Sequence, residues 1–397
     1  MSGTLGNLYA NVSYALQLHA SDMTRLQEQA ATGSQINRIS DSPNTAHQVL
    51  TLNSRISTLK NYKSNLTDLI STFEFTSSTL NSMNGELTEA KRLITQISAG
   101  IYGEDNRERI ADGINDHLNQ LIQLANSKHV NQYIFSGADS NTVPYTVTRD
   151  STSGEVTAVT YQGSADQRTI QTAPGVDTNA FLVGSDTLGL DERQTPIFAI
   201  ENTAATLGLG THSVTGDVWL TVTHDGTDYN LSINGGTVVD VGTVSDATNV
   251  AVTDSNGRVL YIDATSITDT GTDLIRVPGT YNVFDTLISV RDMLNNTHSL
   301  PTHQLQQALQ VSIESVTDVS NHVLQGDLSI GLTTGFLYDL QESLDTMQND
   351  ASMEADSLEQ ADIAQIAIDL ARREVLYEMS LSVAGKLMSV TLLDFIR

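Results

Sequence analysis

The most constraining feature of this 397-residue sequence is a line of apolar residues spaced by threes and fours over residues 360–397. Such spacing predicts a helix with one apolar side. The line consists of Ile363, Ile366, Leu370, Leu376, Met379, Val383, Leu387, Val390 and Leu393. Chain ends are usually polar and loosely held. We therefore expect another apolar surface to bury this one.

A comparable line occupies the other end of the chain. It consists of Leu5, Tyr9, Val12, Leu16, Met23, Leu26 and Ala30. Its steps of four and three are typical of a heptad seam, and Gly33 predicts the end of the helix. His19 occupies the one irregular place, where we interpret it as a tolerated polar residue, because no second metal ligand lies at helical spacing.

We expect the two terminal helices to pair within a subunit and then to pack against neighbouring subunits. The predicted self-assembly seam consists of Leu5, Val12, Leu16, Met23, Leu26, Leu376, Met379, Val383, Leu387, Val390 and Leu393. A lone pair of helices cannot cover its seam on all sides, so much of the burial should occur only on assembly. The ends of a free monomer should then be disordered.

Proline positions predict the architecture between the two ends. Proline occurs only at positions 43, 144, 174, 196, 278 and 301, and it is the strongest helix breaker. Residues 144–278 hold four of the six, together with many Gly, Thr, Asp and Val residues that favour strands and turns. The sequence therefore predicts an α+β fold, with long helical coiled-coil or bundle rods from both termini and a central β-rich domain.

The first rod is expected to start directly after a proline. Ser42 is a candidate N-cap and Pro43 a candidate first helical residue. An apolar seam then continues to about residue 98, which gives a helix roughly 80 Å long at 1.5 Å per residue. A third helix over about 105–129 should fold back on this rod.

The second rod follows the β-rich part. A helix is expected to start near residue 282 and to end before Pro301. A longer helix should then occupy about 303–353. Three glycines, at positions 326, 331 and 335, leave the middle of that helix undecided, because glycine destabilises helix interiors.

The central part predicts hairpins. Asp225-Gly226, Asn234-Gly235 and Asn256-Gly257 stand between runs of alternating residues, which is a hairpin signal. Residues 150–290 contain 18 Asp and Glu against 4 Arg. This balance predicts a solvated acidic face on the β-rich part, within which about 190–279 form a second block.

The charge and composition exclude several functional classes. A formal net charge of −27 argues against nucleic-acid binding, which uses basic surfaces. The chain has no cysteine, and therefore no disulfide or thiolate site. Residues 1–20 lack basic residues and a continuous apolar core, so we expect no cleaved signal peptide. No run of about 18 apolar residues occurs, so we expect no membrane insertion.

Motifs for catalysis and cofactor binding are incomplete. Gly208 and Gly210 begin a dinucleotide fingerprint, but Ser213 stands where the third glycine belongs. The Gly385-Lys386 pair lacks the first glycine of a phosphate-binding loop, and HExxH and GxSxG are missing. We therefore expect no enzymatic activity and no cofactor.

Two short acidic segments resemble pieces of calcium loops. They begin at Asp225 and Asp254, and both lack a Glu at the twelfth position. We interpret them as turns and expect no metal site. Trp219, the only tryptophan, is interpreted as a packing residue of a strand.

Residues 25–46 (RLQEQAATGSQINRISDSPNTA) resemble the first interhelix segment of the flagellin superfamily. The turn formed by Arg38, Ser40, Asp41 and Pro43 is closer to the hook–filament junction branch, hook-associated protein 3, than to filament flagellin. Ser42 departs from the second Asp that the family often has there.

Three further segments carry the same resemblance. Residues 380–397 (SLSVAGKLMSVTLLDFIR) resemble the terminal helix of the superfamily. Residues 131–145 and 282–287 resemble the segments that flank the β domain of the junction branch. The resemblance covers about residues 1–172 and 280–397. The block at 190–279 has no counterpart that we recognise.

The resemblance implies a structural, non-enzymatic component of the bacterial flagellum. Proteins of this branch are extracellular and leave the cell through the flagellar type III channel, with an uncleaved N-terminal segment and a cytosolic export chaperone. The implied partners are other copies in a ring-like homo-oligomer, hook-associated protein 1 and flagellin. The implied role is to join the hook, through hook-associated protein 1, to the flagellin filament.

Two alternatives stay open at this point. The chain could be a flagellin that forms the filament itself, since both branches share the terminal helices. It could also be an exported carbohydrate-binding or enzymatic protein that uses the 190–279 block.

The expected organisation has three parts. Residues 1–43 with 355–397 should form an inner assembly core, and residues 44–143 with 281–354 a helical rod. Residues 144–280 should form a β-rich outer domain.

Overall fold

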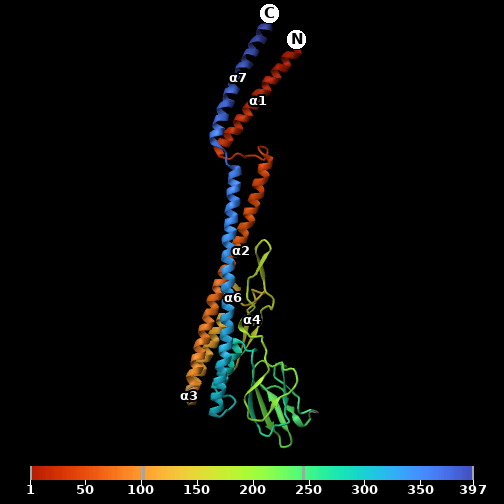
Figure 1. The fold of residues 1–397 in the computed structure, drawn as a ribbon, viewed down its shortest axis with the longest axis vertical. Coiled ribbons are helices and arrows are strands. Elements are labelled where there is room, and N and C mark those ends of the chain that lie inside the picture. The colour runs from red at the N-terminus through yellow and green to blue at the C-terminus, as the bar shows by residue number, and fades with distance from the viewer. Residues whose placement is uncertain (1, 99, 101–102, 244–245, 396–397) are drawn as a thin grey trace. The chain divides into compact units, whose positions relative to one another are not determined.

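A computed structural model of the chain describes residues 2–98, 100, 103–243 and 246–395 (Figure 1). It describes side chains for these residues except 2–9, 243 and 387–395. The chain forms two compact units, residues 1–64 with 340–397 and residues 65–339. Each unit is considered by itself below.

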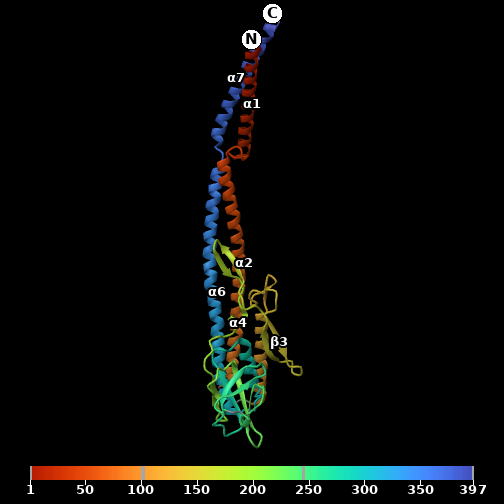
Figure 2. The same cartoon turned by 90° about the vertical axis from the view of Figure 1, so that its right-hand side faces the viewer.

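The first unit consists of helices. It contains α1 (Ser2–Thr32), α7 (Ile363–Phe395), the beginning of α2 (Pro43–Ser98) and the end of α6 (Thr302–Glu359). Helices α1 and α7 lie side by side in both views (Figures 1 and 2). Between α2 and α6, Lys63 Nζ lies 2.5 Å from a carboxylate oxygen of Asp345. The predicted long helices at both ends of the chain are confirmed.

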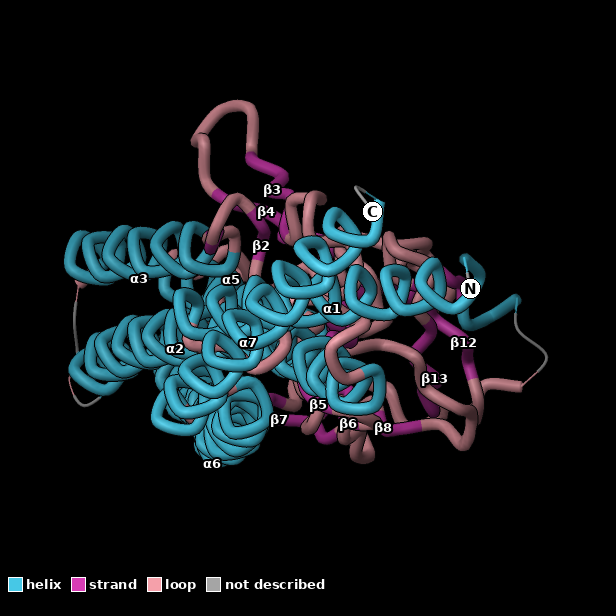
Figure 3. The backbone as a smooth tube through the Cα atoms, turned by 90° about the horizontal axis from the view of Figure 1, so that it is seen from above, coloured by secondary structure: helices cyan, strands magenta, loops and turns pink. Residues whose placement is uncertain are grey.

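The second unit contains a helical bundle. It is built from the rest of α2, α3 (Glu104–Ala125), α5 (Val283–Leu294) and the first part of α6. Helix α3 runs alongside α2 (Figure 3), where His117 Nδ1 and a carboxylate oxygen of Glu86 are 2.6 Å apart. The buried seam follows heptad spacing on all three long helices. Its fully buried members include Leu66, Leu80, Met83, Leu87, Ile94, Ile114, Leu118, Leu121, Val316, Val323 and Leu337.

Two helix boundaries differ from the sequence-based expectation. Helix α6 continues without a break through all three glycines, because burial of seam residues such as Val323, Ile330 and Leu337 outweighs roughly 1 kcal/mol per interior glycine. Helix α3 ends at Ala125, before the expected His129. The Asn126 side chain exchanges two 2.9 Å hydrogen bonds with the backbone of Tyr145, and this pairing turns the chain out of the helix.

Short hairpins follow α3. Three antiparallel pairs, β1–β2, β3–β4 and β5–β6, precede the short helix α4 (Gly184–Leu188). Their bounds are β1 (Lys128–His129), β2 (Gln132–Tyr133), β3 (Tyr145–Arg149), β4 (Val156–Tyr161), β5 (Thr169–Ala173) and β6 (Val176–Asn179). These strands lie in the part of the chain where the sequence predicts a β-rich domain.

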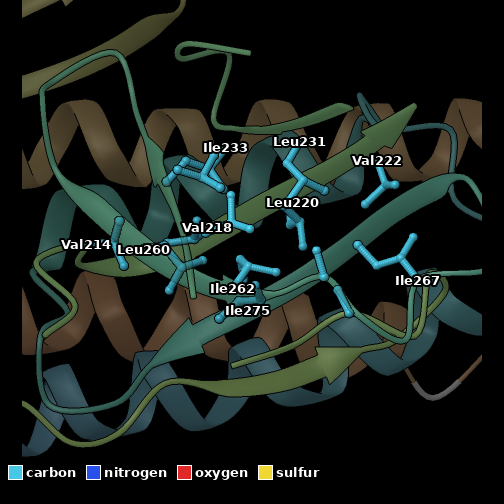
Figure 4. Close-up of a cluster of buried hydrophobic side chains, with 14 of the residues drawn as sticks. Val214, Val218, Leu220, Val222, Leu231, Ile233, Leu260, Ile262, Ile267 and Ile275 are labelled. Carbon is cyan, nitrogen blue, oxygen red and sulfur yellow. The ribbon is translucent and has the colours of Figure 1, made fainter. Parts of the chain in front are cut away.

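Two antiparallel sheets follow, and they enclose one apolar core (Figure 4). The larger sheet has the order β11-β10-β9-β14-β7 and the smaller β12-β13-β8. The strands are β7 (Ile197–Ile200), β8 (Thr206–Leu207), β9 (Gly216–His224), β10 (Tyr229–Ile233), β11 (Val239–Asp240), β12 (Val250–Thr253), β13 (Val259–Asp263) and β14 (Gly271–Val277). The three hairpins predicted from Asp-Gly and Asn-Gly pairs are confirmed as β9–β10, β10–β11 and β12–β13.

The larger sheet also holds polar side chains that contact the helices. Asp217 of β9 accepts hydrogen bonds from Tyr281 Oη at 3.1 Å and Ser289 Oγ at 2.7 Å. Arg276 of β14 donates to Tyr281 and to Ser315 of α6. Trp219, 8% exposed, stacks on His298 with ring centroids 4.1 Å apart. Buried polar contacts therefore join the sheet to the helices.

Candidate self-association surface

The paired helices α1 and α7 bury few side chains. Among residues 10–32 and 363–386, whose side chains the structure describes, the buried ones are Leu26, Gln29 and Ile366. A helix pair embedded in a core would instead cover a full seam. Over these described residues, the pair therefore has little cover from its own chain.

Large apolar side chains are exposed along the same pair. They are Tyr14, Leu18, Ile363, Ile368, Val375, Leu376, Met379, Leu381 and Val383. Met379 is 61% exposed and Val383 50%. Exposed apolar side chains gathered along one helix pair are typical of an interaction site.

The predicted seam residues divide into three groups. On α1, Leu26 is buried, while Val12, Leu16 and Met23 are half-buried. On α7 the described members are exposed, namely Leu376, Met379 and Val383. The side chains of Leu5, Leu387, Val390 and Leu393 lie outside the described part of the structure. The structure thus brings α1 and α7 together, and the use of the seam in assembly stays a prediction.

Polar contacts between α1 and α7 centre on Arg373. Its guanidinium lies 3.1 Å from Asp22 and 3.3 Å from His19 Nδ1. Such partly exposed ion pairs contribute little stability, about 0–1 kcal/mol. His19 therefore has a hydrogen-bonding role at the helix pair.

The connectors next to this pair are hydrogen-bonded to each other. Gln35 N donates to Glu359 O at 2.7 Å, and Ala361 N donates to Gly33 O at 3.0 Å. Gly33 has a φ of +69°, a conformation that glycine adopts without strain. The buried Gln29 side chain donates through Nε2 to Gln35 O at 2.6 Å. Sequence reasoning missed the pairing of Gln35 with Glu359, because no local pattern marks a contact between residues more than 300 positions apart.

The predicted turn at residues 38–43 is held by a side chain that accepts backbone hydrogen bonds. The Asp41 carboxylate accepts hydrogen bonds from the backbone N–H groups of Asn37 at 3.1 Å and Arg38 at 2.8 Å. Arg38 also pairs with Glu28 of α1 at 3.2 Å. Ser40 is exposed, and Pro43 is the first residue of α2, as expected. The turn therefore shapes the passage from α1 to α2.

The acidic segments that resemble calcium loops are turns. Asp254 accepts hydrogen bonds from the backbone N–H groups of Asn256 and Arg258, and its other oxygen lies 2.7 Å from Arg258 Nε. Backbone N–H groups of Asp228 and Thr227 hold the pKa of Asp225 below its usual range. Within the described residues, no three His, Cys, Asp or Glu side chains gather in a way that could hold a metal ion.

In the parts of the chain that the structure describes, no helix combines the length and apolar character needed to span a membrane.

A family model matches the N-terminal third of the chain. Residues 7–140 match the bacterial flagellin N-terminal helical region. No curated protein sequence matches the chain. Residues 7–140 include α3 and most of α1 and α2.

Solved structures with the same fold are flagellar proteins. Hook-associated protein 3 from Legionella pneumophila superposes with a TM-score of 0.54 at 15% identity, covering 78% of this chain and 98% of that one. A hook-associated protein described as putative, from Vibrio parahaemolyticus, has a TM-score of 0.51 at 14% identity, covering 81% and 100%. A flagellar junction protein from Legionella pneumophila has a TM-score of 0.50 at 15% identity, covering 80% and 100%.

The N-terminal match identifies a flagellin-type helical region over residues 7–140 of this chain. The chain also shares the fold of the solved hook-associated protein 3 from Legionella pneumophila. The resemblance inferred from the sequence is confirmed at the level of that region and of the fold.

Proposed function

We propose that this chain is a non-enzymatic structural subunit of the bacterial flagellum that joins the hook to the flagellin filament. Its partners would be other copies of itself in a ring-like oligomer, hook-associated protein 1 on the hook side and flagellin on the filament side. The exposed apolar surface of α1 and α7 is the observation that carries this proposal. The flagellin-type N-terminal region and the fold support it.

The physical basis is burial on assembly. A fully buried Leu, Val or Met side chain stabilises a structure by about 1.5–3 kcal/mol relative to an exposed one. Met379 and Val383 are at least half exposed in the single chain, so this gain is available to a neighbouring subunit. Residues 1–43 with 355–397 would form the assembly core, 44–143 with 281–354 the rod, and 144–280 an outer domain.

The proposed location is extracellular, in the flagellum. Export would use the flagellar type III channel, an uncleaved N-terminal segment and a cytosolic chaperone. These features follow from the family resemblance and belong to the proposal.

Charged substitutions on α7 test self-association. Met379→Asp and Val383→Asp should leave thermal unfolding of the monomer nearly unchanged, because both side chains are exposed. They should abolish polymer formation measured by sedimentation, because each assembled copy would bury a carboxylate. Normal polymers from both variants would refute self-association through α7.

Imaging of intact flagella tests the junction role. Labelled chain should mark a short zone where the hook meets the filament. Label along the whole filament would instead assign the chain as a filament flagellin.

A further inference from the structure

A cavity lies where the β3–β4 hairpin, α4 and the start of α5 meet the residues that flank β9 and β14. Its volume is about 240 Å³, and all of its lining belongs to the unit formed by residues 65–339. We call it the hairpin cavity. The side chains that matter below are Tyr145, Val159, Tyr161, Ser185, Thr215 and Phe284.

Aromatic rings form one wall of the hairpin cavity. The Tyr145 ring packs against the rings of Tyr161 and Phe284, with centroids 5.2 and 4.8 Å away. The Tyr161 hydroxyl donates to the carbonyl oxygens of Phe135 at 3.1 Å and Ser164 at 3.0 Å. These contacts fix the rings before any ligand binds, which lowers the entropic cost of binding.

Gly184 leaves the space that two of these rings occupy. A Cβ atom at this position would lie 2.7 Å from Tyr145 Oη and 2.9 Å from the Tyr161 ring. A larger residue would therefore displace both rings. The aromatic wall depends on a glycine at the start of α4.

The Tyr145 hydroxyl is buried without a hydrogen-bond partner. Tyr145 is 5% exposed, and its hydrogen bonds with Asn126 use only the Tyr145 backbone. Among the described residues, no group pairs with its Oη. Burial raises the pKa of Tyr145, so the hydroxyl keeps its proton at neutral pH and can donate it. Buried hydroxyl groups normally have a partner, and a ligand in the cavity would supply one.

Two further hydroxyl groups line the hairpin cavity. Ser185 donates its proton to Asp186 at 2.9 Å, so its oxygen is left as an acceptor. Thr215 accepts a hydrogen bond from Arg258, so its proton is left to donate. Within the described residues, no Lys, Arg, His, Asp or Glu side chain lines the cavity. This lining favours an uncharged ligand, because burial of an unpaired ion is costly.

The size and chemistry of the lining indicate the class of ligand. An apolar cavity of about 150 Å³ holds one benzene molecule, so the hairpin cavity has room for one substituted six-membered ring. Aromatic faces combined with a few hydroxyl groups fit a molecule that has an apolar face and hydroxyl groups of its own. A neutral hexopyranose ring has both. An aromatic hydrocarbon would leave the Tyr145 hydroxyl unpaired.

We propose that the hairpin cavity binds one neutral hexopyranose unit, as a free sugar or as the terminal residue of a glycan. The sugar ring lies against Tyr161, and one of its hydroxyl groups accepts a hydrogen bond from Tyr145 Oη. This inference does not rest on the proposed self-association, because the cavity and the α1–α7 pair belong to different units.

The first experiment titrates the full chain with glucose, galactose, mannose and N-acetylglucosamine, each as the free sugar and as its methyl glycosides. Saturation-transfer NMR and calorimetry should detect at least one ligand with a Kd of about 1–10 mM. A methyl glycoside that binds as well as the free sugar would identify the end of a glycan. Binding of the free sugar alone would identify a monosaccharide. If toluene binds and no sugar does, or if nothing binds, the proposal is refuted.

The second experiment uses Tyr145→Phe, which removes only the hydroxyl group. The Kd for the sugar should rise about three- to tenfold, as expected for one lost hydrogen bond. The Tm should stay nearly unchanged, because the hydroxyl has no partner in the described part of the chain. Tyr229→Phe is the matched control, since Tyr229 lies outside the cavity and its hydroxyl donates to Thr268 O at 2.8 Å. That control should bind the sugar like the wild type.

The third experiment fills the cavity with Val159→Tyr. Val159 is half-buried on β4, so the larger side chain should be tolerated in thermal unfolding and should abolish sugar binding. Unchanged sugar binding in Val159→Tyr or in Tyr145→Phe would show that the sugar binds elsewhere and would refute the assignment.

The outcomes are independent of the proposed function. Val159→Tyr and Tyr145→Phe should form polymers like the wild type, because neither residue belongs to the α1–α7 pair. If Met379→Asp polymerises normally while the sugar still binds, self-association through α7 is refuted and the sugar site stands. If the sugar does not bind while Met379→Asp abolishes polymers, the reverse holds.

Discussion

The backbone N–H of Gln35 donates a 2.7 Å hydrogen bond to the carbonyl oxygen of Glu359. Gln35 follows α1 in the chain, and Glu359 is the last residue of α6. A second bond, from Ala361 N to Gly33 O, completes the pairing of the two connectors. Because α1 and α7 bury few side chains against each other, this pairing sets their common starting point and hence their register.

The connector pairing predicts a specific effect of Gln29→Ala. The buried Gln29 amide donates to the Gln35 carbonyl, and its loss should cost about 1 kcal/mol of unfolding free energy. Amide hydrogen exchange at Gln35 and Ala361 should become faster. Gln27→Ala is the control, because Gln27 is exposed on the same helix. Equal amide exchange rates at Gln35 and Ala361 in the two variants would contradict a role of Gln29 in holding the connectors together.

The Asp217–Arg276 pair predicts a large effect of Asp217→Ala. Both side chains are 6% exposed, and their charged atoms lie 3.4 Å apart. Removing the carboxylate leaves the Arg276 charge buried without this partner, which should cost about 3–5 kcal/mol in urea unfolding. Replacing both by apolar residues, Asp217→Leu with Arg276→Met, should recover most of that loss. Asp177→Ala, at an exposed position, should change stability little.

His298 predicts a dependence of stability on pH. Burial against Trp219 lowers the pKa of His298 from its usual value near 6.5. As pH falls below about 6.5, the unfolded chain takes up a proton at His298 that the folded chain does not bind, so stability decreases. His298→Phe should lose less stability than the wild type between about pH 7.5 and about pH 5. If urea unfolding showed that the variant and the wild type lose the same unfolding free energy over this pH range, His298 would be excluded as the titrating group.

The turn between β1 and β2 predicts a stabilising substitution. Val130 has a φ of +46° and is 80% exposed. A β-branched residue is strained in this region, whereas asparagine adopts it more readily. Val130→Asn should therefore raise the unfolding free energy by about 1 kcal/mol. Val143→Asn, at an exposed valine without positive φ, should give no such gain.

Much of the fold could be predicted from local signals. Helix α2 starts at Pro43, the kind of residue that favours a first helical position. The Asn282 side chain caps α5, and the hairpins followed Asn-Gly and Asp-Gly pairs. An exposed apolar row of α6 was missed, although its residues recur every fourth position, at Leu324, Leu328, Leu332 and Phe336. A second apolar row offset from the seam was the available signal. The three glycines beside or within it drew the interpretation toward a possible helix break.

The sequence alone determined where helices and strands form and which helix faces are apolar. Backbone conformation responds to neighbours within a few residues, so periodicity, caps and turn residues were sufficient for this. Only the tertiary structure decided which apolar faces are covered, as it did when it buried Leu337 and left Leu332 exposed. It also brought Gln35 to Glu359 and Asp217 to Arg276. Such contacts depend on packing between distant segments, which no local pattern encodes.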